Sequence, residues 1–291
     1  MKVLVLGATG MFGNMMMTSL YKDGRYEAWG TLRDITGLKH FPAVIHPNLI
    51  SGVDVLDEDK VQSVFETVQP DVVINCVGLI KQLATANDPL IVLPINAMLP
   101  HRLSRICGEF NSRLVHISTD CVFSGDKGFY DESSESDAKD LYGKSKYIGE
   151  VTELLHAITL RTSIIGHELT TNYALIDWFL SQKETVKGYV NAIYTGLPTI
   201  ELANVIMDYV IPRPNLNGLY QVASKPVNKY DLLQLVSEIY GKKITIIPDK
   251  SFNMDRSLNG ARFAEATNYI VPDWPELVEK MHRSQSLAGV N

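Results

Sequence analysis

The apolar residues at the start of the chain form an unbroken run from Val3 to Leu6. A run without polar alternation is typical of a parallel strand that helices cover on both faces. Gly7, Gly10 and Gly13 follow at three-residue spacing and lead into an apolar segment, residues 15–20, which reads as the inner side of a helix. The pattern therefore predicts a buried strand, a glycine-rich turn and a helix.

The same alternation of strand and helix continues through the first half of the chain. Apolar runs predict further strands at residues 26–33, 49–55, 72–74 and 114–117. Helices are expected at residues 57–68 and 88–110, and Pro94 and Pro100 must kink or break the second one. Strands that alternate with helices are typical of an α/β domain of the Rossmann type, with a doubly wound parallel sheet.

The glycine turn indicates what this domain binds. A turn of this kind, from a buried strand into a helix, lets backbone N–H groups approach a pyrophosphate at the positive end of the helix. The spacing is G-x-x-G-x-x-G rather than G-x-G-x-x-G, and an ordinary strand-to-helix turn is the alternative. Its position directly behind an apolar strand favours a dinucleotide. The expected contacts are Gly7, Thr9, Gly10, Met11, Phe12 and Gly13.

Beyond Leu160 the pattern changes, because glycine and proline turns divide the chain into short pieces. Helices are expected there at residues 172–181, 200–210 and 229–240. We expect residues 1–160 to form an NAD(P)-binding domain that carries the catalytic residues. Residues 161–291 are expected to be mainly a smaller, mixed α+β substrate-binding lobe, with some segments that return to the first domain. Ligands favour the crevice between two such lobes.

Composition narrows the class of protein. The 291 residues are 45% hydrophobic and 21% charged, which is ordinary for a globular chain with a large core. A formal net charge of −6 without a basic run argues against nucleic acid or an anionic membrane as a partner. The first residues lead straight into a strand and no apolar stretch has membrane-spanning length, so a cytoplasmic protein is expected. Three scattered cysteines predict neither a disulfide framework nor a metal site.

The ends of the predicted strands bear on the cofactor. In dinucleotide folds, a carboxylate after the second strand accepts the ribose 2′-OH, whereas an arginine can take a 2′-phosphate. Arg33 therefore favours NADP(H), Asp34 keeps NAD(H) open, and a solvated loop cation is the alternative for the arginine. Asp54 and Val55 are placed to edge the adenine. Residues 75–77 are small enough to leave room for the cofactor, and the thiol among them is expected to be buried and inert.

Candidate catalytic groups follow the fifth predicted strand. Ser118 and Thr119 stand where an open parallel sheet presents its ligand site. Tyr142 and Lys146 are four residues apart and share one face of a helix. A free tyrosine loses its proton near pH ~10, and a nearby ammonium favours the phenolate and lowers that value. Tyr142 can then protonate a carbonyl oxygen as a hydride reaches the carbon, with Thr119 or Ser118 bonded to that oxygen and Lys146 also reaching the nicotinamide ribose.

Each of these features is common by itself, because Tyr-x-x-x-Lys pairs occur on many solvated helices and Ser-Thr-Asp in many turns. Their order behind the glycine turn favours the catalytic interpretation. Four segments together resemble the extended short-chain dehydrogenases/reductases: GATGMFG at 7–13, STDCVFSG at 118–125, YGKSK at 142–146 and RTS at 161–163. The branch that the chain most resembles is that of dTDP-4-dehydrorhamnose reductase and related nucleotide-sugar 4-ketoreductases.

The resemblance implies NAD(P)H-dependent reduction of the C4 ketone of a nucleotide-linked 4-keto-6-deoxyhexose, in the synthesis of surface polysaccharide precursors. The implied catalytic trio is Thr119, Tyr142 and Lys146. Besides the glycine turn and Arg33, the implied cofactor contacts are Asp54, Val55, Asn75, Cys76, Val77, Ser118, Tyr142, Lys146, Arg161, Thr162 and Ser163. The implied substrate contacts are Val122, Phe123 and Arg256, the last near the diphosphate, with a surface cation as the alternative for Arg256. Dimers are common among relatives, which leaves a homodimer open.

Two departures from the branch leave the sugar and its nucleotide, dTDP or UDP, open. Cys121 stands where the rhamnose reductases usually carry a tyrosine, and residues 255–259 differ from the expected arginine-proline pattern. The superfamily also contains 4-epimerases, which regenerate their cofactor, and 4,6-dehydratases, which place a glutamate at the position of Cys121. A non-catalytic, NADP-binding regulatory subunit is a further alternative, because one relative of this branch has that role for methionine adenosyltransferase. Retention of the trio argues against it.

Overall fold

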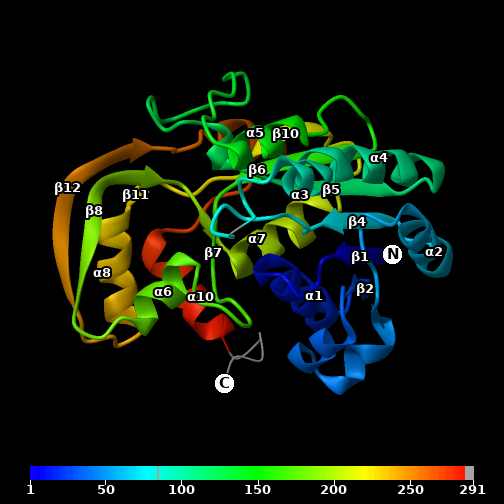
Figure 1. Ribbon diagram of the computed structural model, residues 1–291, viewed down its shortest axis with the longest axis horizontal. Helices are drawn as coiled ribbons and strands as arrows, with labels where there is room; N and C mark the ends of the chain where they lie inside the picture. Colours follow the sequence, from blue (N-terminus) through cyan, green and yellow to red (C-terminus); the bar gives the residue numbers. More distant parts are fainter. Residues whose placement is uncertain (84, 286–291) are drawn as a thin grey trace.

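Within the residues that the computed structural model describes, 1–83 and 85–285, the largest sheet has seven parallel strands in the order β10-β6-β5-β4-β1-β2-β3 (Figure 1). They are β1 (Lys2–Leu6), β2 (Glu27–Thr31), β3 (Leu49–Ile50), β4 (Val72–Asn75), β5 (Arg113–Thr119), β6 (Ala157–Thr162) and β10 (Gly218–Gln221). The order reverses beside β1, where β4 lies on one side and β2 on the other. This confirms the predicted doubly wound α/β fold, in which ligands bind at the carboxyl ends of the strands near such a reversal.

Helices cover both faces of this sheet, as the unbroken apolar run of β1 predicts. Val3 and Val5 belong to a core shared with α1 (Met11–Asp23), α7 (Thr199–Val205) and α10 (Trp274–Ser284). Leu4 and Leu6 belong to a second core with α2 (Glu58–Val68) and α4 (Leu99–Glu109). Successive side chains of a strand point to opposite faces, so four adjacent apolar residues fill two cores. The helix α5 (Leu141–Ile148) follows the short 3₁₀ turn η4 (Asp120–Val122), which begins directly after β5.

A smaller sheet in the order β11-β8-β12 forms the other part of the molecule and confirms the predicted mixed lobe. The long strands β8 (Thr185–Tyr194) and β12 (Thr245–Asp255) run parallel, and β11 (Val227–Asn228) pairs antiparallel with β8. In Figure 1 this ribbon curves along the left edge, with α8 (Lys229–Ile239) packed inside it. The elements beyond residue 163 not yet named are β7 (Ile164–Ile165), α6 (Leu175–Ser181), β9 (Leu197–Pro198), the π-helical turn η5 (Ile206–Val210), which continues α7, and α9 (Ala261–Thr267).

The strand predicted at residues 49–55 is wrong beyond Ile50. β3 ends there, and Gly52 adopts a left-handed φ of +75°. The backbone then closes onto the end of β2, because Val53 N donates to the carbonyl of Leu32 at 3.1 Å. The predicted strand at 26–33 is also shorter, since β2 ends at Thr31 and the 3₁₀ turns η1 (Ile35–His40) and η2 (Ala43–Asn48) follow.

The helical region with the two prolines is interrupted but not broken. Between α3 (Pro89–Leu93) and α4 lies a π-helical turn, η3 (Pro94–Met98), in which Leu99 N donates to the carbonyl of Pro94. The backbone stays right-handed throughout, because the wider turn accommodates residues that lack an N–H donor. Among the described residues, no helix combines the length and apolar composition that a membrane crossing requires.

Candidate active site

The glycine turn between β1 and α1 has the close packing that a phosphate cradle needs. Gly7 has a left-handed φ of +79°, and a Cβ on Gly13 would lie 2.1 Å from the carbonyl oxygen of Gly7. Within the described chain, no side chain caps the N-terminus of α1, which begins after Gly10. Its first N–H groups therefore remain for a ligand at the positive end of the helix dipole. This geometry fits the pyrophosphate of a dinucleotide, with Thr9 half-buried beside the turn.

The turn after β2 holds the predicted adenosine contacts. Arg33 is exposed and makes no hydrogen bond or ion pair within residues 1–83 and 85–285. The carboxylate of Asp34 caps η1 by accepting from the N–H of Thr36 at 2.7 Å. Asp54 accepts from Leu56 N at 3.0 Å and is exposed, with half-buried Val55 next to it. The guanidinium is thus free for a ligand, whereas the neighbouring carboxylate already has a backbone partner.

The segment after β4 closes the other side of the glycine turn. Asn75 accepts from the N–H of Val77 at 3.1 Å and donates to Nδ1 of His116 at 3.1 Å. Val77 lies so close to Gly7 that a Cβ there would be 2.9 Å from its Cγ2. Burial raises the pKa of the Cys76 thiol, which therefore stays protonated, as expected for an inert cysteine.

Close backbone contact places the catalytic helix on the end of β5. The carboxylate of Asp140 caps α5 by accepting from Gly143 N at 2.7 Å. A Cβ on Gly143 would lie 2.2 Å from the carbonyl oxygen of Cys121, so the helix could not approach η4 this closely with any other residue there. Tyr142 and Lys146 lie one turn apart on this helix, as their spacing predicts.

The predicted trio meets where β5 ends. Thr119 is the last residue of β5, and its hydroxyl donates to Asp120 Oδ1 at 3.2 Å. Lys146 is 6% exposed, and its ammonium donates to the carbonyl of Ile117 at 2.7 Å. Thr119 also lies close enough to the phenol of Tyr142 to lower its pKa. An acid, an ammonium and a hydroxyl are therefore brought to one strand end.

The pKa of Tyr142 differs in direction from the sequence-based expectation. Burial raises this pKa, and hydrogen bonding by Thr119 opposes the rise only in part. Burial also lowers the pKa of Lys146 to about 8. Removal from water disfavours the charged form of each group and determines the direction of both shifts. Tyr142 thus keeps its proton at neutral pH.

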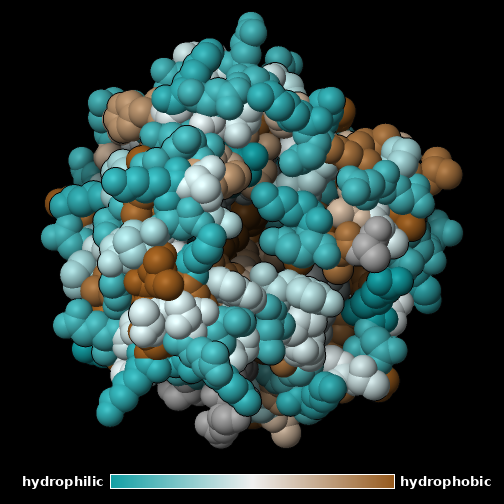
Figure 2. Space-filling view, turned by 60° about the vertical axis from the view of Figure 1, so that its left-hand side comes forward, coloured by the Kyte–Doolittle hydropathy of each residue, from teal (hydrophilic) through white to brown (hydrophobic). Residues whose placement is uncertain are grey.

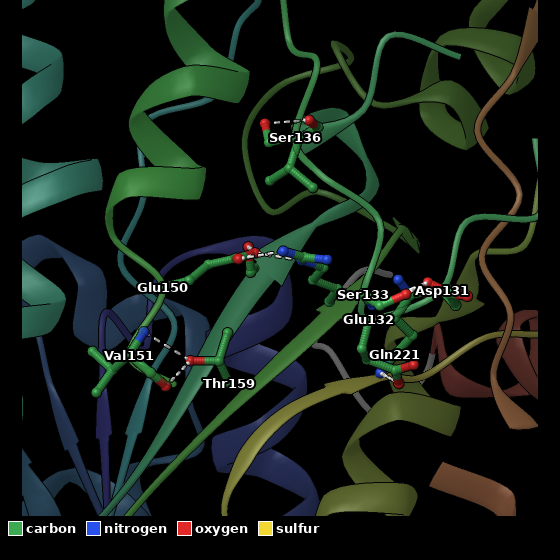
Figure 3. A network of polar contacts seen from close by, with 11 residues as sticks. Asp131, Glu132, Ser133, Ser136, Glu150, Val151, Thr159 and Gln221 are labelled. Carbon is green, nitrogen blue, oxygen red and sulfur yellow. Dashed lines mark hydrogen bonds and ion pairs between the residues drawn. The ribbon is translucent and has the colours of Figure 1, made fainter. Parts of the chain in front are cut away.

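Two predicted cofactor residues have their side chains committed elsewhere. Ser118 Oγ donates to Glu150 Oε1 at 2.7 Å, and Arg161 donates to both carboxylate oxygens of Glu150 at 2.8 and 2.7 Å. Figure 3 shows Glu150 and its polar contacts in this network. The hydroxyl of Ser118 is thus engaged, whereas Nη1 of Arg161 is buried without a partner among the described residues. The adjacent Thr162 is buried, and its hydroxyl donates to the carbonyl of Ser163 at 3.3 Å.

The predicted substrate residues lie in two different environments. Val122 and Phe123 are fully buried with Tyr130 and Leu258, and the rings of Phe123 and Tyr130 stack at 4.1 Å. Their side chains anchor the loop after η4 and do not reach the surface. Arg256, in contrast, donates from Nη1 to the sulfur of Cys121 at 3.2 Å, and its buried Nε has no partner among the described residues.

Sequence reasoning missed two further cations around η4, Lys81 and Lys229, which lie near the predicted Arg256. Lys81 and Arg256 both oppose the rise that burial causes in the pKa of Asp120. Burial lowers the pKa of Lys229, at the start of α8, and the positive charges of Lys81 and Arg256 lower it further. Three cations from distant segments therefore gather near one carboxylate. Figure 2, in which the smaller lobe is turned forward, shows this side hollowed near its centre, apolar in its depth and largely hydrophilic around the rim.

Asn96, in the π-helical turn η3, is another residue that the sequence did not reveal. Its side chain accepts from Leu79 N at 2.8 Å and donates to the carbonyl of Leu79 at 3.0 Å and to Ser145 Oγ at 3.3 Å. It thereby ties the loop after β4 to the catalytic helix. A π-helical turn inside a helix often marks a functional site. The prolines in the sequence predict an interruption of the helix, but they do not identify a π-helical turn.

The comparisons with known proteins agree on one family. The family model described as RmlD substrate binding domain matches residues 1–266. The chain is 25% identical over 258 residues to a probable low-salt glycan biosynthesis reductase of Haloferax volcanii, covering 85% of this chain and 83% of that one. It is 32% identical over 171 residues to the methionine adenosyltransferase 2 subunit beta of Danio rerio, covering 58% of this chain and 49% of that protein.

Among solved structures, dTDP-4-dehydrorhamnose reductase from Bacillus anthracis, in complex with NADP, has a similar fold. The TM-score is 0.78 at 19% identity, with 97% of this chain and 99% of that chain covered. At this identity, the likeness supports the fold described above.

The glycine turn supplies a direct test of dinucleotide binding. We expect Gly13→Ala to abolish NADPH binding, because its Cβ would lie 2.1 Å from a backbone oxygen and must push α1 away from the turn. Gly260→Ala is the control, since its Cβ would lie 3.4 Å from its nearest neighbour, the side chain of Ala223, at an ordinary φ of −85° and outside the glycine turn. Fluorescence titration with NADPH measures both variants. Equal affinities would contradict this assignment of the turn.

Proposed function

Because the chain belongs to the RmlD substrate-binding domain family, we propose that it is an NAD(P)H-dependent reductase of a nucleotide-linked 4-keto-6-deoxyhexose. The observation that carries the proposal is the meeting of Thr119, Tyr142 and Lys146 at the carboxyl end of β5. The reaction would supply a deoxy sugar for surface polysaccharide synthesis in the cytoplasm, with the sugar and its nucleotide left to experiment.

Tyr142 would act as the general acid. A bound nicotinamide dinucleotide supplies the hydride to C4, and the phenol of Tyr142 gives its proton to the carbonyl oxygen, which leaves an alcohol and a phenolate. Burial raises the pKa of Tyr142, so the proton is in place at neutral pH. Thr119 lies beside the phenol and can donate to the same carbonyl oxygen.

Lys146 would stabilise the negative charge that develops on Tyr142. Its ammonium is buried and lies one helical turn from the phenol, so the attraction is screened little by water. With a pKa of about 8, the group is charged at neutral pH and loses this charge as the pH rises. Proton delivery in the direction of reduction should therefore weaken on the basic side of neutrality.

The glycine turn and Arg33 support NADP(H) as the preferred cofactor, while NAD(H) stays open. The uncapped N-terminus of α1 would hold the pyrophosphate. Arg33 would take the 2′-phosphate, because it is exposed and free, whereas the Asp34 carboxylate that would accept a 2′-OH caps η1.

The cations around η4 support a polyanionic substrate. The buried Nε of Arg256 has no partner within the described chain. Lys81 and Arg256 act on the pKa of Asp120 and on that of Lys229, so the three cations lie near one another. A nucleoside diphosphate is a ligand that such a cluster would attract. Arg256 donates to the thiol of Cys121, which lies close enough to Tyr142 to raise its pKa. This proximity supports a polyanionic group of the substrate beside Tyr142.

The first experiment is oxidation of NADPH and NADH with dTDP- and UDP-linked 4-keto-6-deoxyhexoses generated in situ. A reductase consumes the reduced cofactor in proportion to product. An epimerase would convert the sugar without net consumption, and a non-catalytic subunit would bind NADPH and turn over nothing. Either of these last results would overturn the proposed reduction.

Tyr142→Phe tests the acid. We expect kcat to fall at least ~100-fold, the lower range for a general acid, with NADPH affinity nearly unchanged. Tyr147→Phe is the control, because Tyr147 lies on the same helix but is 44% exposed. Full activity of the Tyr142→Phe variant would show that another group delivers the proton.

Arg33→Ala tests the cofactor preference. The KM for NADPH should rise about 10- to 100-fold, as expected for a lost charge-assisted contact, while that for NADH changes little. The exposed Lys39, in η1, supplies the control variant Lys39→Ala. If both cofactors were affected equally, Arg33 would not read the 2′-phosphate.

A further inference from the structure

Glu150 is a buried carboxylate that lies just beyond the end of α5. Its side chain is 3% exposed, as is that of its partner Arg161. Oε1 accepts from Ser118 Oγ at 2.7 Å and from Arg161 Nε at 2.8 Å, and Oε2 accepts from Arg161 Nη2 at 2.7 Å. Three donors to two oxygens satisfy the carboxylate, which forms an ion pair with the guanidinium of Arg161. The sequence offers no use for this charge, and the hydride-transfer chemistry needs no contact with it.

The geometry of β5 brings this charge close to Lys146. The carbonyl of Ile117 accepts from Lys146 Nζ at 2.7 Å, and the hydroxyl of the next residue, Ser118, binds Glu150 at 2.7 Å. Lys146 and Glu150 are also four residues apart in the sequence, at the end of one helix. Consecutive residues of a single strand therefore anchor the ammonium and the carboxylate.

Lys146 has no direct ion-pair partner among the described residues to offset its burial. The residue is 6% exposed, and the hydrogen bond of its ammonium goes to a neutral carbonyl. A buried ammonium without a neighbouring anion tends to lose its proton, because the charged form is the one that burial disfavours. Something must offset this for Lys146 to remain an ammonium at neutral pH.

We propose that Glu150 is a positioning residue that keeps Lys146 charged, and that Ser118 and Arg161 hold the carboxylate in place for this purpose. The proposal rests on the proposed function, in which the ammonium stabilises the phenolate of Tyr142. Glu150 touches no reacting atom and acts only through Lys146. This role explains why the ion pair between Arg161, in β6, and Glu150, just beyond α5, is close to Lys146.

The other titratable groups that face Lys146 do not supply this charge. Cys76, at the end of β4, and His116, in β5, are buried, and burial moves the pKa of each in the direction that keeps it neutral. Tyr142, on the same helix, is likewise held in its neutral form by burial. Asp120, in η4, raises the pKa of Tyr142. Burial raises the pKa of Asp120 itself, and the positive charges of Arg256 and Lys81 oppose that rise. Glu150 is the group whose charge raises the pKa of Lys146 most strongly.

The sign of the effect follows directly. Burial lowers the pKa of Lys146 to about 8, and the negative charge of Glu150 counteracts that lowering. Removal of the charge must lower the pKa of Lys146 further. The ammonium is then lost at a lower pH, and the basic limb of kcat for reduction moves in the same direction.

The test is titration of Lys146 in the full-length protein with its cofactor absent. Carbon-13 labelling of lysine Cε follows the titration by NMR, and Lys146→Arg identifies the signal. The wild-type signal should titrate at about 8. In Glu150→Gln it should move down by about one pH unit or more, the lower range for loss of an opposite charge nearby. Glu150→Asp keeps the charge at a slightly greater distance and should fall between the two.

Two further variants separate this role from a structural one. Glu153→Gln removes an exposed carboxylate from the same segment and should titrate like the wild type. The double variant Glu150→Gln/Arg161→Gln removes both buried charges, so it avoids the unpaired arginine that could unfold Glu150→Gln. It should still show the lowered titration of Lys146. An unchanged titration in a folded Glu150→Gln or in the double variant would overturn the proposal.

The functional readout is the pH profile of kcat, measured with the member of the substrate panel that the wild type reduces. Its basic limb should move with the NMR titration in each variant. If no substrate is reduced by the wild type while the titration shifts as expected, the proposed function fails and the charge relation stands. If the wild type reduces a substrate but Lys146 titrates alike in all variants, the role of Glu150 fails alone.

Discussion

The site depends on how closely the catalytic helix approaches the backbone around it. A Cβ on Gly143 would lie 2.2 Å from the carbonyl oxygen of Cys121, and one on Gly149 would lie 2.1 Å from that of Asn96. Neither contact could exist with a larger residue. The two glycines seat α5 between the end of β5 and the π-helical turn η3. The positions of Tyr142 and Lys146 therefore follow from backbone packing rather than from contacts of their own side chains.

The same close packing removes water from the ionisable groups and so determines their charges. Burial raises the pKa of Tyr142 and lowers that of Lys146 to about 8. In the proposed mechanism, the first shift keeps the proton on Tyr142, and the second would weaken the ammonium that stabilises the resulting phenolate. A buried carboxylate at Glu150 offsets the second shift without competing for the proton of the first. The arrangement separates the group that donates the proton from the charge that supports it.

Local spacing predicted the fold well, and it failed where the backbone left the expected path. The run from Val3 to Leu6 predicted a strand between two helical layers, because burial on both faces leaves no polar position. The strand predicted to Val55 stops at Ile50, since a left-handed turn at Gly52 is not visible as a change in hydrophobicity. The expectation that a neighbouring ammonium governs Tyr142 also failed, because the degree of burial is a property of the packed molecule.

By itself, the sequence determined the glycine turn, the layered sheet and the shared face of Tyr142 and Lys146. The glycine turn depends on the absence of Cβ atoms. The sheet and the shared helix face depend on the side-chain periods of a strand and a helix, which act over one strand or one helical turn. Only the tertiary structure decided that Glu150 meets Ser118, 32 residues earlier, and that Asn96 binds Ser145, 49 residues later. It also decided that Arg256 reaches Cys121, 135 residues before it. Such contacts depend on how whole elements pack, and no local pattern of residues encodes that.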